Sequence, residues 1–296
     1  MVSITLLLPV LGFAQQNTQV EKQVIKGLEV ETGYFFNGQP YAKVGSGEKI
    51  LIQIEALSFD HVPPEGFILK LFVQHNKVFC DEYTVYHIGR KPNLPEGYTI
   101  DDMSKDYGVL IQSKFQGKVD VVGLSTGGQI GLSLTANFPQ LINKLVVISA
   151  AYRVSENGKM LEKKSAEYYG QEKYGKTTAT IIEVVYDKGF KQTFYKTMMR
   201  MAGRSMLKDV RYPNDFQVEV MADLNFDFKK RLKEIKVPTL IVAGEKDLGY
   251  SIEDVKLTSK GIENSELILY DDYGHNLYPD NYKEVNSNIL VFLNQD

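Results

Sequence analysis

A serine flanked by glycines lies between a predicted strand and a predicted helix, and this arrangement constrains the fold more than any other feature. The motif GLSTG at 123–127 follows the β-branched run 118–122 and precedes the helix-forming run 128–134. Glycines two residues before and two after Ser125 remove Cβ clashes, so that a strand can turn sharply into a helix. The helix N-terminus also directs N–H groups toward an anion beside the serine. The sequence therefore predicts an accessible nucleophile at the carboxyl end of a strand.

Strand and helix patterns alternate along most of the chain. Besides the strand that precedes Ser125, apolar runs predict strands at 29–34, 40–44, 49–54, 83–87, 144–149, 237–243 and 267–270. Helices are predicted at 67–73, from a capping threonine at 99 through 111, and near the C-terminus over 282–292. This alternation predicts an α/β fold with a mostly parallel sheet that helices cover on both faces.

The alternation stops between about residues 152 and 228. This segment is polar and helical in pattern, and it is too long for a loop inside a compact core. We therefore expect a helical lid insertion over the carboxyl ends of the strands, within a single domain that spans 15–296. Methionines are concentrated there, and they either line an apolar pocket under the lid or form the packed interior of the insertion. They are Met160, Met198, Met199, Met201, Met206 and Met221, six of the eight in the chain.

A nucleophilic serine needs a base to take its proton, and the base needs an acid to orient it. Of the four histidines, His275 is the one that follows the last predicted strand, and Asp247 follows the strand before it. Because the carboxyl ends of parallel strands share one edge of a sheet, we expect Ser125, Asp247 and His275 to meet there. The competing acids are Glu245, Asp271 and Asp272.

These motifs resemble the α/β-hydrolase superfamily, and the resemblance extends from residue 29 to the C-terminus. It implies the α/β-hydrolase fold, a lid at 152–228, and acyl transfer to water by the catalytic residues Ser125, Asp247 and His275 without a cofactor. It leaves the substrate open among esters, lactones, thioesters, peptides and carbon–carbon bonds. A serine in place of an aspartate argues against epoxide opening and halide displacement. We expect a small-molecule acyl substrate, most simply a small or medium apolar carboxylic ester.

The residues after the strand at 49–54 depart from the family pattern. Many relatives carry His-Gly there, whereas this chain has Glu55-Ala56-Leu57. The N–H groups of Thr126 and of Leu57 or Ala56 are expected to form the oxyanion hole, because backbone donors do not depend on the side chains. A carboxylate facing that hole would repel the oxyanion. Glu55 therefore points away, pairs with a base such as Arg90, is protonated, or contacts the substrate. The candidate substrate-binding residues are Glu55 and Leu124.

Two alternative functions remain open. An aminopeptidase-type hydrolase of the same fold would need an acid for the substrate ammonium, supplied by Glu55 or by the insertion. A ligand-binding homologue that has lost catalysis is the second alternative. The departure at Glu55-Ala56 supports the second alternative, and the complete serine, acid and histidine set opposes it.

Composition limits the partners and the location. The net charge is −3 and no basic run is present, so neither a nucleic acid nor an anionic membrane surface is expected. Cys80 is the single cysteine, which excludes an intrachain disulfide, and we expect it to be a buried, unreactive thiol. No spacing of ligands predicts a metal site. The apolar stretch 4–11 is too short to span a bilayer. We expect residues 1–14 to be a signal peptide that directs export to the periplasm or the medium, with a cytoplasmic location as the alternative.

Overall fold

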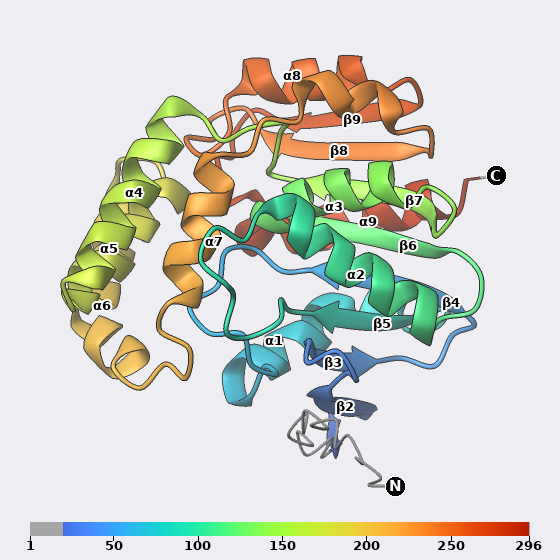
Figure 1. The fold of residues 1–296 in the computed structure, drawn as a ribbon, viewed down its shortest axis with the longest axis horizontal. Helices are drawn as coiled ribbons and strands as arrows, with labels where there is room; N and C mark the ends of the chain where they lie inside the picture. The colour runs from blue at the N-terminus through green and yellow to red at the C-terminus, as the bar shows by residue number, and fades with distance from the viewer. Residues whose placement is uncertain (1–19, 296) are drawn as a thin grey trace, which may run out of the picture.

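The computed structural model describes residues 20–295, and a nine-stranded sheet forms the centre of this part of the chain. The strand order is β1-β2-β3-β5-β4-β6-β7-β8-β9 (Figure 1). The strands β1 to β3 pair antiparallel with their neighbours, and all neighbouring pairs from β5 to β9 are parallel. The expected mostly parallel sheet is thus confirmed. The strands are β1 (Glu21–Ile25), β2 (Leu28–Tyr34), β3 (Pro40–Val44), β4 (Lys49–Ile54), β5 (Tyr83–Ile88), β6 (Val119–Leu124), β7 (Ile142–Ile148), β8 (Thr239–Gly244) and β9 (Ser265–Tyr270).

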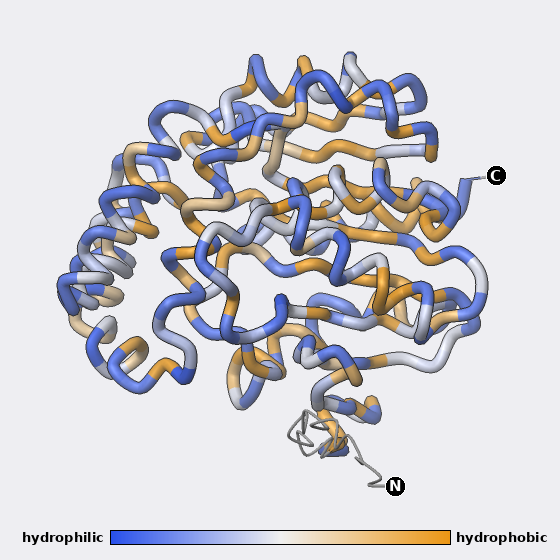
Figure 2. The backbone as a smooth tube through the Cα atoms, viewed as in Figure 1, coloured by the Kyte–Doolittle hydropathy of each residue, from blue (hydrophilic) through white to orange (hydrophobic). Residues whose placement is uncertain are grey.

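Helices cover both faces of the sheet, as the alternating pattern predicts. Successive strand residues point to opposite faces: Val121 packs in one core with residues of α2, α3 and α8, and Val122 packs in the other with residues of α1 and α9. Figure 2 shows the hydrophobic strands between these helical layers. The covering helices are α1 (Gly66–Asn76), α2 (Ile100–Lys114), α3 (Thr126–Asn137), α8 (Ile252–Gly261) and α9 (Leu277–Leu293), and the short 3-10 helices are η1 (Lys77–Phe79) and η2 (Lys229–Glu234).

Four helices lie between β7 and β8, in the segment where the alternation stops. They are α4 (Glu156–Gly170), α5 (Tyr174–Val185), α6 (Phe190–Leu207) and α7 (Asp215–Leu224). Figure 1 shows α4, α5 and α6 stacked beyond one end of the strands, with α7 between them and the sheet. The segment is helical, as its composition suggested, and its action as a lid stays a prediction.

The methionines of this segment do not occupy the places that the sequence suggested. Five of the six are exposed, so they neither line a covered pocket nor form a packed interior, and that expectation is wrong. The exposed ones are Met160, Met198, Met201, Met206 and Met221. The small interior of the segment is built instead from Tyr169, Leu207, Phe216 and Val220.

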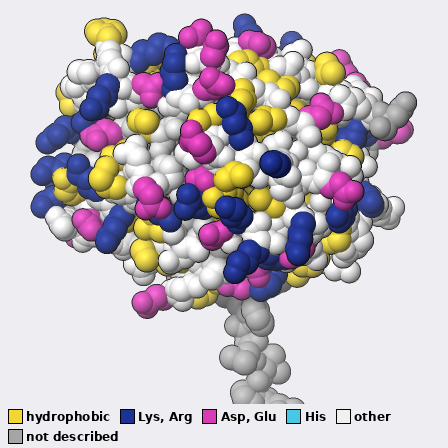
Figure 3. Space-filling view, turned by 90° about the horizontal axis from the view of Figure 1, so that it is seen from above, with side chains coloured by type: hydrophobic (Ala, Val, Ile, Leu, Met, Phe, Trp, Pro, Cys, Tyr) yellow, Lys and Arg dark blue, Asp and Glu magenta, His cyan; other side chains and the backbone are white. Residues whose placement is uncertain are grey.

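The surface carries charges of both signs. Figure 3 shows Lys and Arg side chains interspersed with Asp and Glu on one face of the molecule. Across residues 20–295 no helix combines the length and the apolar character that crossing a membrane requires. The expected signal peptide, residues 1–14, lies outside the described residues.

The single cysteine is buried, as expected. The Cys80 thiol donates a hydrogen bond to the carbonyl oxygen of Asn76 at 3.3 Å. Burial, reinforced by Asp81, raises the pKa of Cys80 to about 11, so the thiolate that would react is scarce at neutral pH.

Candidate active site

Ser125 occupies a strained turn between β6 and α3. Its φ of 54° and ψ of −123° fall in a region that residues other than glycine rarely adopt. A Cβ on Gly127 would lie 2.2 Å from the carbonyl oxygen of Ile54, and one on Gly123 would lie 2.3 Å from the carbonyl oxygen of Gly127. The two glycines of the motif therefore allow the start of α3 to pack directly on the ends of β6 and β4.

Asp247 and His275 are bonded to each other at the same edge of the sheet. Asp247 follows β8, His275 follows β9, and the His275 Nδ1 lies 2.9 Å from Asp247 Oδ2. The other carboxylate oxygen of Asp247 accepts hydrogen bonds from the N–H groups of Gly249 at 2.7 Å and Tyr250 at 3.0 Å. Burial alone would lower the pKa of His275, but the charge and hydrogen bond of Asp247, helped by Asp223, raise it above its usual value.

Tyr250 connects the three residues that the sequence singled out. Its backbone N–H bonds Asp247, and its ring stacks on the imidazole of His275 with centroids 5.8 Å apart. Its hydroxyl lies beside Ser125, whose hydroxyl opposes the rise in the pKa of Tyr250 that burial causes. Among the described residues no hydrogen bond joins Ser125 to His275 directly. The structure thus brings Ser125, Asp247 and His275 to one edge of the sheet, at the ends of β6, β8 and β9.

Arg90 holds the backbone that follows β4. Its guanidinium is buried and donates to the carbonyl oxygen of Glu55 at 2.9 Å and to that of Ala56 at 2.7 Å. In a trans peptide the C=O and the following N–H point in opposite directions. The N–H groups of Ala56 and Leu57 therefore point away from Arg90.

The carboxylate of Glu55 is paired with bases. It lies 3.3 Å from Nε2 of His87 and 3.5 Å from Nη1 of Arg90, and 22% of its side chain is exposed. Burial would raise the pKa of Glu55, but His87, Arg90 and His61 together lower it to about 2. Glu55 is therefore ionised, with His87 and Arg90 beside its carboxylate. The structure bears out the expected pairing with Arg90, and it adds His87 to the pair.

Further ion pairs join this loop to α7. His61, completely buried, lies 3.1 Å from Glu219 and 3.2 Å from Asp215, both of α7. Glu219 also pairs with Arg90, and Asp215 accepts the N–H of Leu94 at 2.7 Å. We call Arg90, His61, Asp215 and Glu219 the Arg90 network. It ties the loop after β4 and the loop after β5 to the helical segment.

Two buried acids of the helical segment reach the other side of the site. Asp223 of α7 accepts a hydrogen bond from the Thr126 hydroxyl at 2.5 Å, while its Oδ1 atom has no partner. Glu162 of α4 lies near Asp223, and its Oε2 atom also lacks a partner. Burial raises the pKa of Asp223 to about 7. Burial also raises the pKa of Glu162, and the charge of Asp223 raises it further. Within residues 20–295 no three His, Cys, Asp or Glu side chains are arranged to hold a metal ion.

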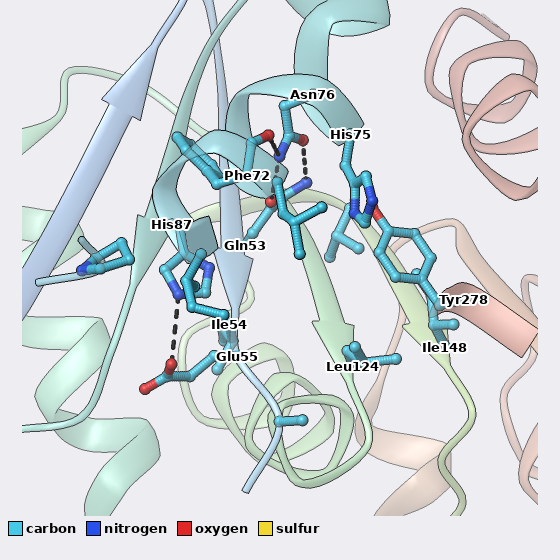
Figure 4. A pocket seen from close by; sticks show the side chains of 15 residues that line it. Gln53, Ile54, Glu55, Phe72, His75, Asn76, His87, Leu124, Ile148 and Tyr278 are labelled. Carbon is cyan, nitrogen blue, oxygen red and sulfur yellow. Dashed lines mark hydrogen bonds and ion pairs between the residues drawn. The ribbon is translucent and has the colours of Figure 1, made fainter. Parts of the chain in front are cut away.

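An apolar cavity of about 200 Å³ lies beside the residue that precedes the serine (Figure 4). It is lined by Leu124 and Ile148 from the sheet, Phe72 from α1 and Tyr278 from α9. Ser125 and His275 are not part of its lining. The candidate contact Leu124 therefore faces this cavity, on the α1 and α9 side of the sheet.

Comparison with known proteins assigns the family. Residues 86–282 match the model of the alpha/beta hydrolase fold family. The chain is 26% identical over 213 residues to the AB hydrolase superfamily protein YisY of Bacillus subtilis, covering 67% of this chain and 75% of that protein. It is 24% identical over 212 residues to Lipase 1 of Psychrobacter immobilis, covering 64% of this chain and 63% of that protein. The protein therefore belongs to the alpha/beta hydrolase family and is a hydrolase with lipase-type relatives.

Solved structures show the same fold. An alpha/beta hydrolase enzyme from a Medee basin deep-sea metagenome library superposes with a TM-score of 0.75 at 17% identity, covering 93% of this chain and 98% of that one. At this level of identity the likeness concerns the fold, and the chemistry has to be argued from the site itself.

Proposed function

We propose that this protein is a serine hydrolase that cleaves a carboxylic ester or a related acyl bond. The observation that carries the proposal is the buried Asp247–His275 pair at the same sheet edge as the strained turn of Ser125. Ser125 attacks the carbonyl carbon, His275 takes its proton and passes it to the leaving group, and Asp247 stabilises the imidazolium. Water then attacks the acyl-serine with His275 as the base, which releases the acid and restores the serine.

The proposed oxyanion hole consists of the N–H groups of Thr126 and Leu57. Thr126 is the first residue of α3, where the helix dipole favours a negative charge. Arg90 supports the second donor, since its bond to the Ala56 carbonyl fixes the peptide that carries the Leu57 N–H. The pairing of Glu55 with His87 and Arg90 keeps its negative charge compensated beside this hole. Two fixed donors of this kind typically contribute ~10²–10³ in rate each.

The cavity beside Leu124, the residue that precedes Ser125, supports a modest apolar group in the substrate. The cavity beside Leu124 is small and mostly apolar, and a lipase is among the relatives. Ser125 is 8% exposed, which supports a lid role for α4 to α7. We propose that these helices move to admit the substrate and exclude water when they return.

The test is the variant Ser125→Ala. Turnover of p-nitrophenyl butyrate should fall by roughly 10⁴- to 10⁶-fold, because the nucleophile is removed. Labelling by a fluorophosphonate should disappear in the same variant. The matched control is Ser149→Ala, since Ser149 is also a buried serine with positive φ, at the end of the neighbouring strand β7. Labelling that persists in Ser125→Ala would overturn the proposal.

A further inference from the structure

We propose that the acyl group of the substrate carries a protonated amine next to the scissile carbonyl, and that Glu162 and Asp223 bind it. This inference rests on the proposed serine-hydrolase function and specifies its substrate class. The ligand would be an α-aminoacyl ester or amide, held by its ammonium group while Ser125 attacks the adjacent carbonyl.

The first observation is that two buried carboxylate oxygens around the site lack partners. They are Oδ1 of Asp223 and Oε2 of Glu162. Asp223 is 1% exposed, and Glu162 is 6% exposed. Buried polar atoms in folded proteins are nearly always hydrogen-bonded, so a group of orphans in one place indicates a ligand that supplies the missing bonds.

The second observation is the position of these atoms relative to the nucleophile. Asp223 bonds the hydroxyl of Thr126, the residue that follows Ser125. The Tyr250 hydroxyl lies beside Ser125, and the nearby charges of Asp223 and Glu162 add to the effect of burial in raising its pKa. A group bound by the two acids therefore lies next to the carbonyl that Ser125 attacks, which places the amine on the acyl side of the bond.

The third observation is that the nearby bases are already engaged. Arg90 pairs with Glu219 and binds the carbonyl oxygens of Glu55 and Ala56. His275 pairs with Asp247. The two acids thus have no cation of their own. An ammonium group, which donates three hydrogen bonds and carries a positive charge, complements two carboxyl groups and a hydroxyl. A carboxylate on the acyl group would be repelled, and an alkyl group would leave the orphans unpaired.

The binding of an ammonium group by Asp223 and Glu162 should depend on pH. Asp223 faces Thr126, Glu162, Tyr250, Arg90 and His275, and burial raises its pKa and that of Glu162. In the free protein the pair therefore retains a proton at neutral pH, which is released when an ammonium group takes its place. The preference for an amine-bearing substrate should rise from pH 6 toward pH 8, where the α-amino group itself begins to lose its proton.

The experiment compares two esters of the same shape. L-Alanine methyl ester carries an ammonium group where methyl isobutyrate carries a methyl group. We expect the unmodified protein to hydrolyse the alanine ester with a kcat/KM at least about 100-fold higher at pH 7, as charge-paired recognition allows. In Asp223→Asn and in Glu162→Gln the ratio of kcat/KM for the alanine ester to kcat/KM for methyl isobutyrate should fall at least tenfold.

Glu167→Gln is the matched control, because Glu167 is an exposed acid on the same helix α4 and should leave the preference unchanged. Thermal unfolding of each variant verifies that it is folded. A protein that a fluorophosphonate labels but that does not prefer the alanine ester would overturn the inference and leave the proposed function standing. A protein that is never labelled and hydrolyses neither ester would overturn the proposed function itself.

Discussion

Glu55 and Asp223 are two carboxyl groups that approach the turn at Ser125 from different elements. Their surroundings shift their pKa values in opposite directions. Glu55, at the end of β4, is paired with His87 and Arg90, and its pKa falls to about 2. Asp223, on α7, has only the Thr126 hydroxyl as a partner and another acid as a neighbour, and burial raises its pKa to about 7.

The difference teaches that burial alone does not decide the charge of an acid. Burial disfavours ionisation of both groups, and the partners decide whether that effect is overcome. On the Glu55 side each buried acid lies beside a base of the protein itself, so this side serves the architecture of the site. The bases nearest Asp223, Arg90 and His275, are paired with other acids, so the Asp223 side is the one where a ligand has something to add.

The largest expected effect comes from removing the base that completes the Glu55 side. Arg90→Met should lower the free energy of unfolding by about 3–5 kcal/mol, because Glu219 and Glu55 lose a buried counter-charge. Denaturant titration measures this change. Arg90→Lys keeps the charge and should recover part of the stability. It loses the paired hydrogen bonds to two carbonyl groups, so kcat should be lower than in the unmodified protein while KM changes little. A stability change below 1 kcal/mol in Arg90→Met would contradict our account of the Glu55 side.

A second variant tests the backbone contact between the start of α3 and the end of β4. In Gly127→Ala the new Cβ would lie 2.2 Å from the Ile54 carbonyl oxygen and 2.5 Å from that of Glu55, so the start of α3 must shift. We expect kcat/KM for a neutral ester to fall by ~10²–10³, the typical loss of one oxyanion donor. Gly131→Ala, one turn further along α3, meets only side chains, Leu145 at 3.1 Å and Val121 at 3.9 Å, and should keep its activity. Equal activity in the two variants would argue against this geometry.

Two further variants, Asp223→Asn and Glu55→Gln, should change the free energy of unfolding at pH 8 in opposite directions. The folded state favours protonated Asp223, so its contribution is full below the ordinary carboxyl pKa and is lost as the pH rises through about 7. Asp223→Asn should therefore raise the free energy of unfolding at pH 8, by roughly 1–3 kcal/mol, and change it little at pH 5. Glu55 contributes above the ordinary carboxyl pKa, and its contribution is lost as the pH falls through about 2. Glu55→Gln should therefore lower stability at both pH 5 and pH 8. If the free energy of unfolding at pH 8 changed with the same sign in both variants, the proposed difference between Asp223 and Glu55 would be wrong.

The smallest expected effect is on the pH profile of catalysis. Activity on a neutral ester requires neutral His275, so kcat/KM should fall as the pH drops below the pKa of His275, which Asp247 raises above its usual value. Asp223 helps to raise that pKa. Asp223→Asn should therefore move the acidic limb to lower pH by less than about one unit. Glu55→Gln should leave the limb in place, and an equal shift in both variants would contradict the assignment.

The fold was largely predictable because local patterns determine it. The buried strand β8 is an almost continuous apolar run, and the glycines around Ser125 mark the turn between strand and helix. Strand β1 was missed because it is an edge strand with four of its five residues exposed, which leaves no apolar alternation to detect. Helix α8 was missed because it is short, although Ser251 caps it by accepting the N–H of Asp254.

The candidate site was predictable only in part, for a physical reason. Asp247 and His275 follow adjacent strands, so topology alone brings them together, and Arg90 was suggested as a partner of Glu55. Glu162 and Asp223 lie on different helices of the segment between β7 and β8, and no periodic pattern states which faces of those helices meet. Asp215, Glu219 and Asp223 recur every four residues of α7 and so share one face of the helix, and this pattern is a signal that would have pointed to Asp223.

The insertion of α4 to α7 between two strands separates bond cleavage from substrate choice. The three residues proposed to break the bond belong to loops of the sheet, whereas the two acids proposed to select the substrate belong to α4 and α7. Mutational libraries confined to α4 can therefore change which compound is accepted, whereas α7 also carries Asp215 and Glu219 of the Arg90 network that supports the loop after β4. Natural divergence has the same route open to it, since the connection between β7 and β8 can be rewritten while the scaffold is retained.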